Sequence, residues 1–170
     1  QRHNHDAHIM TVEEYNESVD LYSDNLFRFI LSSTNDEEQA RDVVQDSYEK
    51  LWRRVHEVAF EKVRAYLFST AYHTMIDGLR KEKRHQAYLA EKRPEDHEQN
   101  HYTDLNEILH GIIKELPDVQ RSVILLRDYE GYSYHEIGAL TGLSESQVKV
   151  YIYRGRLFLR ERIGRIGVLV

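Results

Sequence analysis

A set of polar, cationic and methyl-bearing side chains recurs at helical spacing near the C-terminal end of the chain: Ser146, Lys149, Val150, Tyr153, Arg154 and Arg156. Arginine and lysine donate hydrogen bonds to base-edge acceptors in the major groove, and apolar atoms contact the thymine methyl group. Residues 131–170 contain six Lys or Arg and three Glu, whereas the whole chain has a net charge of −6. We therefore predict that this segment contacts duplex DNA; the alternative is a solvent-exposed helical hairpin with a basic end.

Two predicted helices would hold these side chains. Ser133 and Ser144 are each followed three positions later by Glu or Gln, and this spacing is the capping box that begins a helix. Gly142 suits a left-handed C-cap between the two helices. Gly138 is expected where the helices cross, and Val148 is expected to anchor the second helix in the core. The segment is therefore predicted to be a helix-turn-helix.

A second basic cluster ends the helix predicted over residues 61–84. Its cations are Arg80, Lys81, Lys83 and Arg84, with Glu82 among them. The aromatic residues Tyr66, Phe68 and Tyr72 lie upstream. Rings interleaved with cations suit an unpaired nucleic-acid strand, because bases stack on the rings while cations contact phosphates. Burial of these rings in a hydrophobic core is the alternative, and spacing alone favours it.

The helix predicted over residues 36–54 has the opposite charge. Its first turn contains three acidic residues, which favour the positive end of the helix dipole. Four further side chains share an outward face: Asp42, Gln45, Asp46 and Glu49. DNA phosphates would repel this face. We therefore predict that it either contacts a basic surface of a protein partner or is an ordinary acidic face exposed to solvent.

Apolar spacing and composition predict an all-α fold. Helical periodicity covers residues 12–31, 36–54, 61–84, 105–116 and 118–128, with a turn over 32–36. Only 8 Gly and 2 Pro occur among 170 residues, which disfavours an all-β or loop-built chain. Residues 85–103 are rich in charge and contain Pro94, with too little apolar surface to offset the entropy of ordering. We predict two small helical domains, 11–84 and 104–170, joined by a flexible linker over 85–103.

The composition also limits the possible chemistry. The chain has no Cys, which excludes disulfides, thiolate metal sites and Cys nucleophiles and suits a reducing cytoplasm. No apolar run reaches the roughly 18 residues of a membrane span. A metal-dependent hydrolase would need ligands such as His3, His5, Asp6 and His8, but residues 1–10 show no periodicity and are predicted to be a disordered arm or an added remnant. We expect no metal, no cofactor, no catalytic residue and no membrane insertion.

Three segments, in this order, resemble the extracytoplasmic-function sigma factors, which are promoter-specificity subunits of bacterial RNA polymerase. They are NDEEQARDVVQDSYEKLWRR, VRAYLFSTAYHTMIDGLRKEKR and LPDVQRSVILLRDYEGYSYHEIGALTGLSESQVKVYIYRGRLFLRERI. The resemblance implies that the first domain corresponds to sigma region 2 and the second to region 4. It implies a cytoplasmic, non-catalytic initiation factor that binds core RNA polymerase and the minus-10 and minus-35 promoter elements.

The resemblance also implies roles for individual residues. Contact with the clamp helices of the largest polymerase subunit falls on Asp42, Gln45, Asp46, Tyr48, Leu51 and Trp52. Contact with the minus-10 element, including capture of a flipped base, falls on Tyr66, Tyr72, His73, Asp77, Arg80, Lys81 and Arg84. Contact with the minus-35 element falls on Lys149, Val150, Tyr153 and Arg154, and we add Ser146 and Arg156 from the same surface.

The chain departs from the family pattern at several positions. His73 stands where members usually have Asn, which leaves the preferred minus-10 base open. Val150 stands where Ser is common, which predicts a methyl contact in place of a hydrogen bond. Leu157 and Phe158 replace residues that are often basic. Together with the terminal Gly-Val-Leu-Val, they predict either a docking surface for a partner such as an anti-sigma factor or a fraying end.

A stand-alone helix-turn-helix regulator is the alternative function. Such a regulator binds operator DNA as a dimer and needs an apolar face for self-association. The sequence contains no heptad run, so we expect a monomer when the chain is free. Tight binding to duplex DNA without polymerase would favour the regulator.

Overall fold

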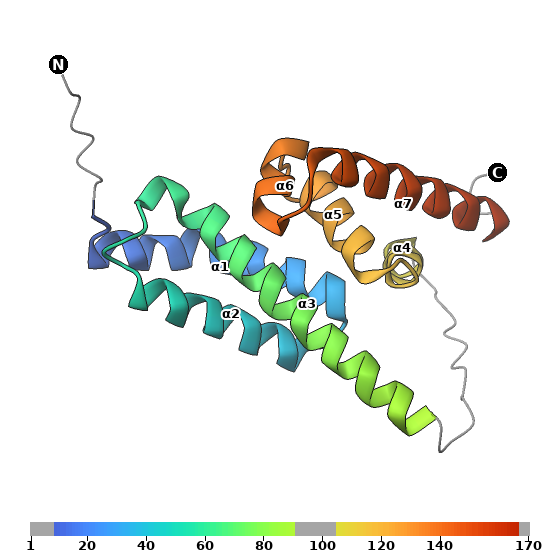
Figure 1. Ribbon diagram of the computed structural model, residues 1–170, viewed down its shortest axis with the longest axis horizontal. Helices are drawn as coiled ribbons and strands as arrows, with labels where there is room; N and C mark the ends of the chain where they lie inside the picture. The colour runs from blue at the N-terminus through green and yellow to red at the C-terminus, as the bar shows by residue number, and fades with distance from the viewer. Residues whose placement is uncertain (1–8, 91–104, 167–170) are drawn as a thin grey trace.

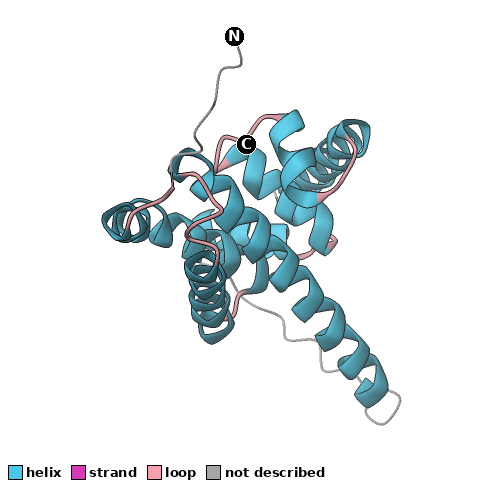
Figure 2. Cartoon of the chain, turned by 60° about the vertical axis from the view of Figure 1, so that its left-hand side comes forward, coloured by secondary structure: helices cyan, strands magenta, loops and turns pink. Residues whose placement is uncertain are grey.

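The computed structural model describes residues 9–90 and 105–166, which are helical and contain no strand (Figure 1, Figure 2). The first half contains α1 (Val12–Thr34), α2 (Glu37–Arg53), the 3-10 turn η1 (Phe60–Lys62) and α3 (Val63–Ala90). The second half contains α4 (Leu105–Lys114), α5 (Asp118–Asp128), α6 (Tyr134–Thr141) and α7 (Glu145–Ile166). The all-α prediction is confirmed. None of the described helices combines the length and the apolar character of a bilayer-spanning helix.

The first two helices meet at a tight reversal. Thr11 begins α1 in a capping box with Glu14, whose N–H donates to the Thr11 hydroxyl at 3.1 Å. Asn35 ends α1 with a φ of 54°, a left-handed conformation that Asn tolerates. Asp36 then begins α2, accepting from the N–H of Gln39 at 3.0 Å. The chain therefore reverses within two residues, as the turn predicted over 32–36 requires.

Apolar side chains of α1, α2 and α3 form the core of the first half. Phe29 of α1 and Phe68 of α3 are buried with ring centroids 5.7 Å apart. Leu51 of α2 has no exposed surface. Burial of one such side chain contributes about 1.5–3 kcal/mol. This core fixes the orientation of α2 and α3, and so determines which of their side chains face outward.

The helix-turn-helix predicted in the second half is formed by α6 and α7. Ser133 and Ser144 cap the two helices, each hydroxyl accepting at 3.1 Å from the N–H three residues later. Gly142 ends α6 with a φ of 79°. Val148 has no exposed surface, and Gly138 lies against the turn. All five residues do what their types and spacing predict.

A buried arginine joins α4 to α5. Arg121 donates to the carbonyl oxygens of Lys114 and Leu116, both at 3.1 Å, and forms an ion pair with Asp118 at 2.6 Å. Carbonyl oxygens at the C-terminal end of a helix lack hydrogen-bond donors within that helix. The Arg121 guanidinium supplies the donor here. Pro117, predicted for the first turn of α5, is the N-cap immediately before it.

The two halves pack against each other. Helices α1 and α3 contact α5, and they also contact α4 and α6 respectively (Figure 1). Most of the buried apolar residues of both halves belong to one continuous cluster. The two predicted domains therefore share a core in this arrangement. Apolar periodicity shows which face of a helix is buried, but it does not show which element covers that face.

Two predicted boundaries differ from the structure. Helix α3 continues to Ala90, six residues into the predicted linker, although residues 81–89 are exposed. Hydrogen bonds along the helix surface, such as Gln86 to Glu82 at 3.4 Å, accompany this extension. Met10, placed in the predicted arm, is 2% exposed. It directly precedes the Thr11 cap, where an apolar residue can pack against the first turn of a helix. The remainder of the predicted arm and linker lies outside the described residues.

Candidate nucleic-acid and protein interfaces

The outer face of α7 presents the six side chains predicted to read duplex DNA. Ser146, Lys149, Val150, Tyr153, Arg154 and Arg156 are all exposed. On the opposite side of α7, Val148 and Ile152 are buried against the rest of the domain. The apolar side therefore holds the helix in place while the polar and cationic side faces solvent.

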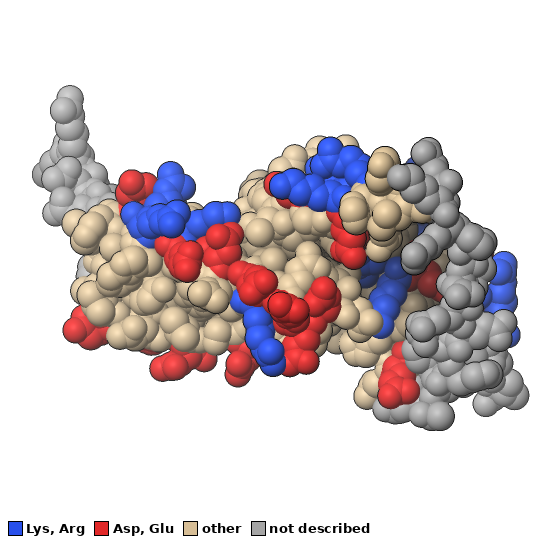
Figure 3. Space-filling model, turned by 90° about the horizontal axis from the view of Figure 1, so that it is seen from below, with Lys and Arg blue, Asp and Glu red and all other residues tan. Residues whose placement is uncertain are grey.

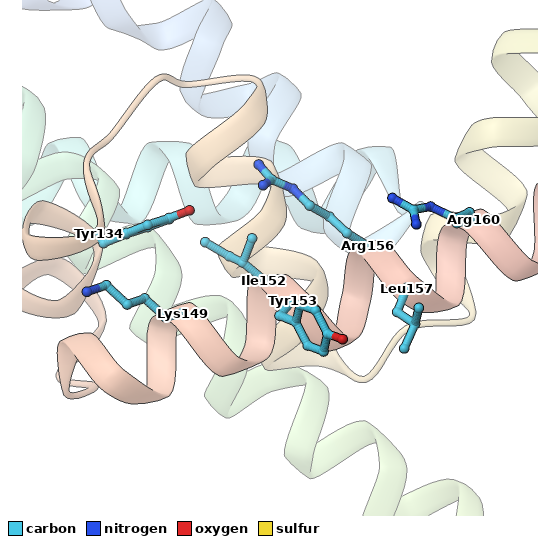
Figure 4. Close-up of a pocket in the computed structure, with 7 residues that line it drawn as sticks. All are labelled: Tyr134, Lys149, Ile152, Tyr153, Arg156, Leu157 and Arg160. Carbon is cyan, nitrogen blue, oxygen red and sulfur yellow. The ribbon is translucent and has the colours of Figure 1, made fainter.

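A shallow cavity of about 270 Å³ lies along this face (Figure 4). It is lined by Tyr134, Lys149, Ile152, Tyr153, Arg156, Leu157 and Arg160. The ring of Tyr134 lies 4.7 Å from the Arg127 guanidinium and 5.9 Å from the Lys149 ammonium group. Sequence reasoning did not select Tyr134 or Arg160 for this surface. The signal was present for Tyr134, because the Ser133 cap places it in the first turn of α6, beside α7.

The cations of this face differ in their acidic partners. Arg156 forms an ion pair with Asp128 of α5 at 2.6 Å, and this hydrogen bond raises the pKa of Arg156. Lys149 lies 3.5 Å from Glu145 on its own helix. Arg154 forms no ion pair with any residue in the described ranges. Unlike Lys149 and Arg156, Arg154 therefore presents a positive charge that no carboxylate of the described residues offsets.

Helix α3 carries the second group of predicted DNA-contacting residues. Five of them are exposed: His73, Asp77, Arg80, Lys81 and Arg84. Tyr66 is half-buried, and Phe68, offered as a stacking aromatic, is fully buried in the core. For Phe68 the core interpretation is therefore correct.

Tyr72 differs from the other predicted minus-10 residues. It is 4% exposed, and burial raises its pKa. Its ring lies 5.1 Å from that of His73 in an edge arrangement. In this arrangement of the chain, Tyr72 offers no open ring face for a base. Contact between Tyr72 and the opened strand stays a prediction, and it requires that the ring be uncovered.

The predicted polymerase-binding residues of α2 divide into an outer and an inner group. Asp42 and Gln45 are exposed, and Asp46 forms an ion pair with Lys50 at 2.8 Å. Trp52 is 49% exposed and its ring lies 5.0 Å from that of Tyr15. Viewed from below, acidic side chains gather in a band across the face where α2 lies (Figure 3). This face is suited to a basic protein surface.

Tyr48 and Leu51, predicted for the same interface, lie inside the core. Leu51 has no exposed surface and Tyr48 is 8% exposed. The Tyr48 hydroxyl donates to the carbonyl oxygen of Ser18 at 2.7 Å, and burial raises the pKa of Tyr48 to about 12. Direct contact of these two residues with polymerase stays a prediction, whereas the structure shows both of them in the core. They are three residues apart and hold α2 against its neighbours, which positions the exposed side chains.

No cluster of three His, Asp or Glu side chains that could hold a metal ion occurs in residues 9–90 and 105–166. His3, His5, Asp6 and His8 lie outside the described residues.

Known proteins match both halves of the chain. Residues 19–85 match the family described as Sigma-70 region 2, and residues 106–159 match Sigma-70, region 4. The ECF RNA polymerase sigma factor SigM of Bacillus subtilis (strain 168) is 28% identical over 162 residues, covering 92% of this chain and 97% of SigM. The RNA polymerase sigma factor SigV of the same strain is 30% identical over 146 residues, covering 82% and 84%.

A solved structure has the same fold. It is the sigma factor RpoE in complex with the anti-sigma factor NepR from Bartonella quintana. The TM-score is 0.74 at 23% identity, and the match covers 90% of this chain and 98% of the RpoE chain. At this identity the likeness concerns the fold alone. It includes both halves of the chain in a single superposition.

Proposed function

The chain belongs to the extracytoplasmic-function sigma factors of the sigma-70 family, and we propose that it directs bacterial RNA polymerase to specific promoters. The observation that carries this proposal is the order of two surfaces along one chain. An acidic and aromatic face lies in the region 2 match, and a cationic helix-turn-helix face lies in the region 4 match. An acidic face suits a protein partner, and a cationic recognition helix suits the major groove.

Region 2 would contact core polymerase through the outer group of α2 side chains. Asp42, Gln45 and Asp46 supply acidic and amide groups for a basic surface, and Trp52 supplies a large ring at the edge. Tryptophan is enriched among the few residues that supply most of the binding energy of protein interfaces. The buried Tyr48 and Leu51 support this surface from below.

The exposed end of α3 would hold the opened minus-10 strand. Arg80, Lys81 and Arg84 supply charge for phosphates, and His73 and Asp77 lie one to two turns upstream on exposed positions. Removing a base from the stack costs a few kcal/mol, so a protein that keeps the strand open must replace the lost stacking. Tyr66, half-buried, can supply a ring; Tyr72 can do so only after its cover is removed.

Region 4 would read the minus-35 element with α7. Arg154 and Lys149 can donate to guanine acceptors, and Val150 can contact a thymine methyl group. Ser146, Tyr153 and Arg156 complete the surface as contacts to bases or phosphates. The polymerase performs the chemistry of RNA synthesis in this scheme, and the chain described here supplies recognition without a catalytic residue.

Run-off transcription with core polymerase and a promoter library tests the proposal. We expect transcripts only when the chain is added, from templates that share two short motifs centred about 25 base pairs apart. Fluorescence anisotropy with the same templates and no polymerase should show weak binding, because few cations release counterions from DNA. Tight, sequence-specific duplex binding without polymerase, together with absent transcription, would favour the stand-alone regulator.

A further inference from the structure

The loop between α5 and α6 inserts a buried carboxylate between two helices of the other half. The side chain of Glu130 is 2% exposed, and its carboxylate lies 3.0 Å from Arg28 of α1. Arg64 of α3 lies 3.9 Å from the same carboxylate and donates to the Glu130 backbone carbonyl at 2.7 Å. Two arginines from the first half therefore hold one glutamate from the second half.

Aromatic contacts surround this ion pair. The Arg64 guanidinium lies 4.3 Å from the ring centre of Tyr132 and 5.5 Å from that of Phe68. The two rings are 5.7 Å apart in an edge arrangement, and both are buried. A short distance along α3, the Ser69 hydroxyl donates to the carbonyl oxygen of Leu140 at 2.9 Å. The contact between the halves thus has specific polar partners as well as apolar area.

A charged contact of this kind is easier to reverse than an apolar core. When the halves separate, water solvates Glu130 and both arginines, so the parted state leaves no charge buried without a partner. One group also opposes closure. The Tyr132 hydroxyl is buried and has no hydrogen-bond partner among the described residues, and an unsatisfied buried hydroxyl destabilises the state that buries it.

The closed arrangement is too compact to reach both promoter elements of the proposed function. Elements centred at minus 10 and minus 35 are about 25 base pairs apart, which is about 85 Å along B-DNA. A compact chain of this length has a radius of gyration of roughly 15 Å, and α3, with 28 residues, is about 42 Å long. The two reading surfaces cannot reach both elements while the halves remain in contact.

The contact also covers part of the minus-10 surface. Ser69 and Tyr72 lie one turn apart on α3, and Ser69 is engaged by α6. Tyr72 is 4% exposed, and burial raises its pKa. At the end of the same helix, Lys83 forms an ion pair with Asp118 of α5 at 2.8 Å.

We propose that the closed arrangement is an autoinhibited state of the free chain, in which Glu130, clamped by Arg28 and Arg64, latches region 4 onto region 2. This inference rests on the proposed function. The latch must open before both promoter elements can be engaged. Tyr132 keeps the latch releasable, because its unsatisfied hydroxyl weakens the closed state.

Two dyes on the full chain can measure opening directly. The sequence has no Cys, so the exposed Asn16 and Glu161 can be replaced by Cys and labelled without background. In this doubly labelled chain, without polymerase or DNA, E130Q should raise the open fraction about tenfold, as expected from losing charged hydrogen bonds. Y132F should lower the open fraction about fivefold or more. The double variant with both substitutions should have an open fraction between those of the two single variants.

A matched control separates the latch from general charge effects. Glu57 forms an exposed ion pair with Arg54 at 3.1 Å within the first half, so E57Q removes the same charge without touching the contact and should leave energy transfer unchanged. Far-UV circular dichroism checks that each variant remains folded. Equal energy transfer in E130Q, Y132F and E57Q would overturn the latch.

Polymerase titration then tests autoinhibition separately. With the latch as proposed, E130Q should need several-fold less chain for half-maximal run-off transcription, and Y132F should need more. An E130Q chain that opens yet shows the wild-type transcription curve would overturn the inhibitory role. Failure of the proposed function would look different: no transcription from any variant, while the differences in energy transfer persist.

Discussion

The carbonyl oxygen of Leu143 lies 2.9 Å from the position that a Cβ atom on Gly138 would occupy. This distance is too short for a carbon–oxygen contact, and the oxygen belongs to backbone that cannot rotate away. The close approach lets α6 and α7 cross at the turn. It explains why the residue at this crossing is glycine, in a helix interior where glycine otherwise costs stability.

Replacing Gly138 should therefore damage the helix-turn-helix specifically. G138A should lower the free energy of unfolding by about 1–3 kcal/mol, because the backbone must shift to admit the methyl group. Thermal unfolding followed by circular dichroism measures the loss. Gly164, also on a helix, has nothing within 4 Å of its Cβ position, so G164A is the control and should leave stability equal or higher. Equal melting temperatures for G138A and the wild type would contradict the close packing.

Arg154 should determine minus-35 discrimination. Its guanidinium has no ion-pair partner in the described part of the chain, so R154A removes a free donor without leaving a carboxylate unpaired. Loss of a base-edge contact costs about 1–3 kcal/mol of discrimination, measured as the ratio of run-off transcription from cognate and minus-35-mutated promoters. Polymerase binding should not change. R165A, which removes an exposed cation about three turns further along α7, is the control and should retain the wild-type ratio.

Asp46 should act on every promoter alike. D46R places a cation on the acidic face of α2 and breaks the ion pair with Lys50. Like charges across an interface oppose binding, so affinity for core polymerase should fall at least tenfold while relative promoter preference stays the same. Competition for core polymerase against a labelled sigma factor measures affinity. D20R makes the same charge change at an exposed position of α1 and should bind normally. A change in promoter preference with normal affinity would reverse the roles assigned to the two halves.

Alkaline pH should weaken the fold through Tyr48. Burial raises its pKa in the folded state from 10.0 to about 12. The full contribution of the protonated hydroxyl is therefore present below pH 10 and is lost as the pH rises toward 12, because the unfolded chain ionises first. The expected slope is about 1.4 kcal/mol per pH unit.

Urea unfolding at pH 9 and pH 11 measures this effect. The wild type should lose more stability between the two values than Y48F, which also loses the hydrogen bond to Ser18, worth about 1 kcal/mol at neutral pH. Y129F, which changes a half-exposed tyrosine, should retain the wild-type pH dependence. Identical losses in Y48F and the wild type would show that folding does not raise the pKa of Tyr48.

Local chemistry made much of the fold predictable from sequence. Ser133, Ser144 and Gly142 determine their helix ends through one or two neighbouring residues, so their caps could be read directly. The bounds of α5 also follow, because Pro117 precedes it and its apolar residues repeat at helical spacing. The exposure of the α7 reading face follows from the burial of Val148 on the other side.

Tertiary contacts determined the parts that could not be predicted. Leu51 and Trp52 are neighbours in a recognised motif, yet one is fully buried and the other is half-exposed. Tyr72 lies on a helix whose cover comes from the other half of the chain. Glu130 reads as one more charge in an acidic sequence, and only the folded chain brings Arg28 and Arg64 to it. These outcomes depend on residues far away in sequence.

The final turns of α3 bury no side chain: residues 81–89 are all exposed, and Lys83 reaches the other half through its exposed ammonium group, which pairs with Asp118. A short helical segment without packing is marginal in water, and its helicity falls as temperature rises. Warming should therefore fray this end while the buried helices remain intact. Binding to the phosphates of the opened strand would then weaken at a lower temperature than binding of α7 to duplex DNA. The upper working temperature of the factor would therefore be set by this helix end and not by global unfolding.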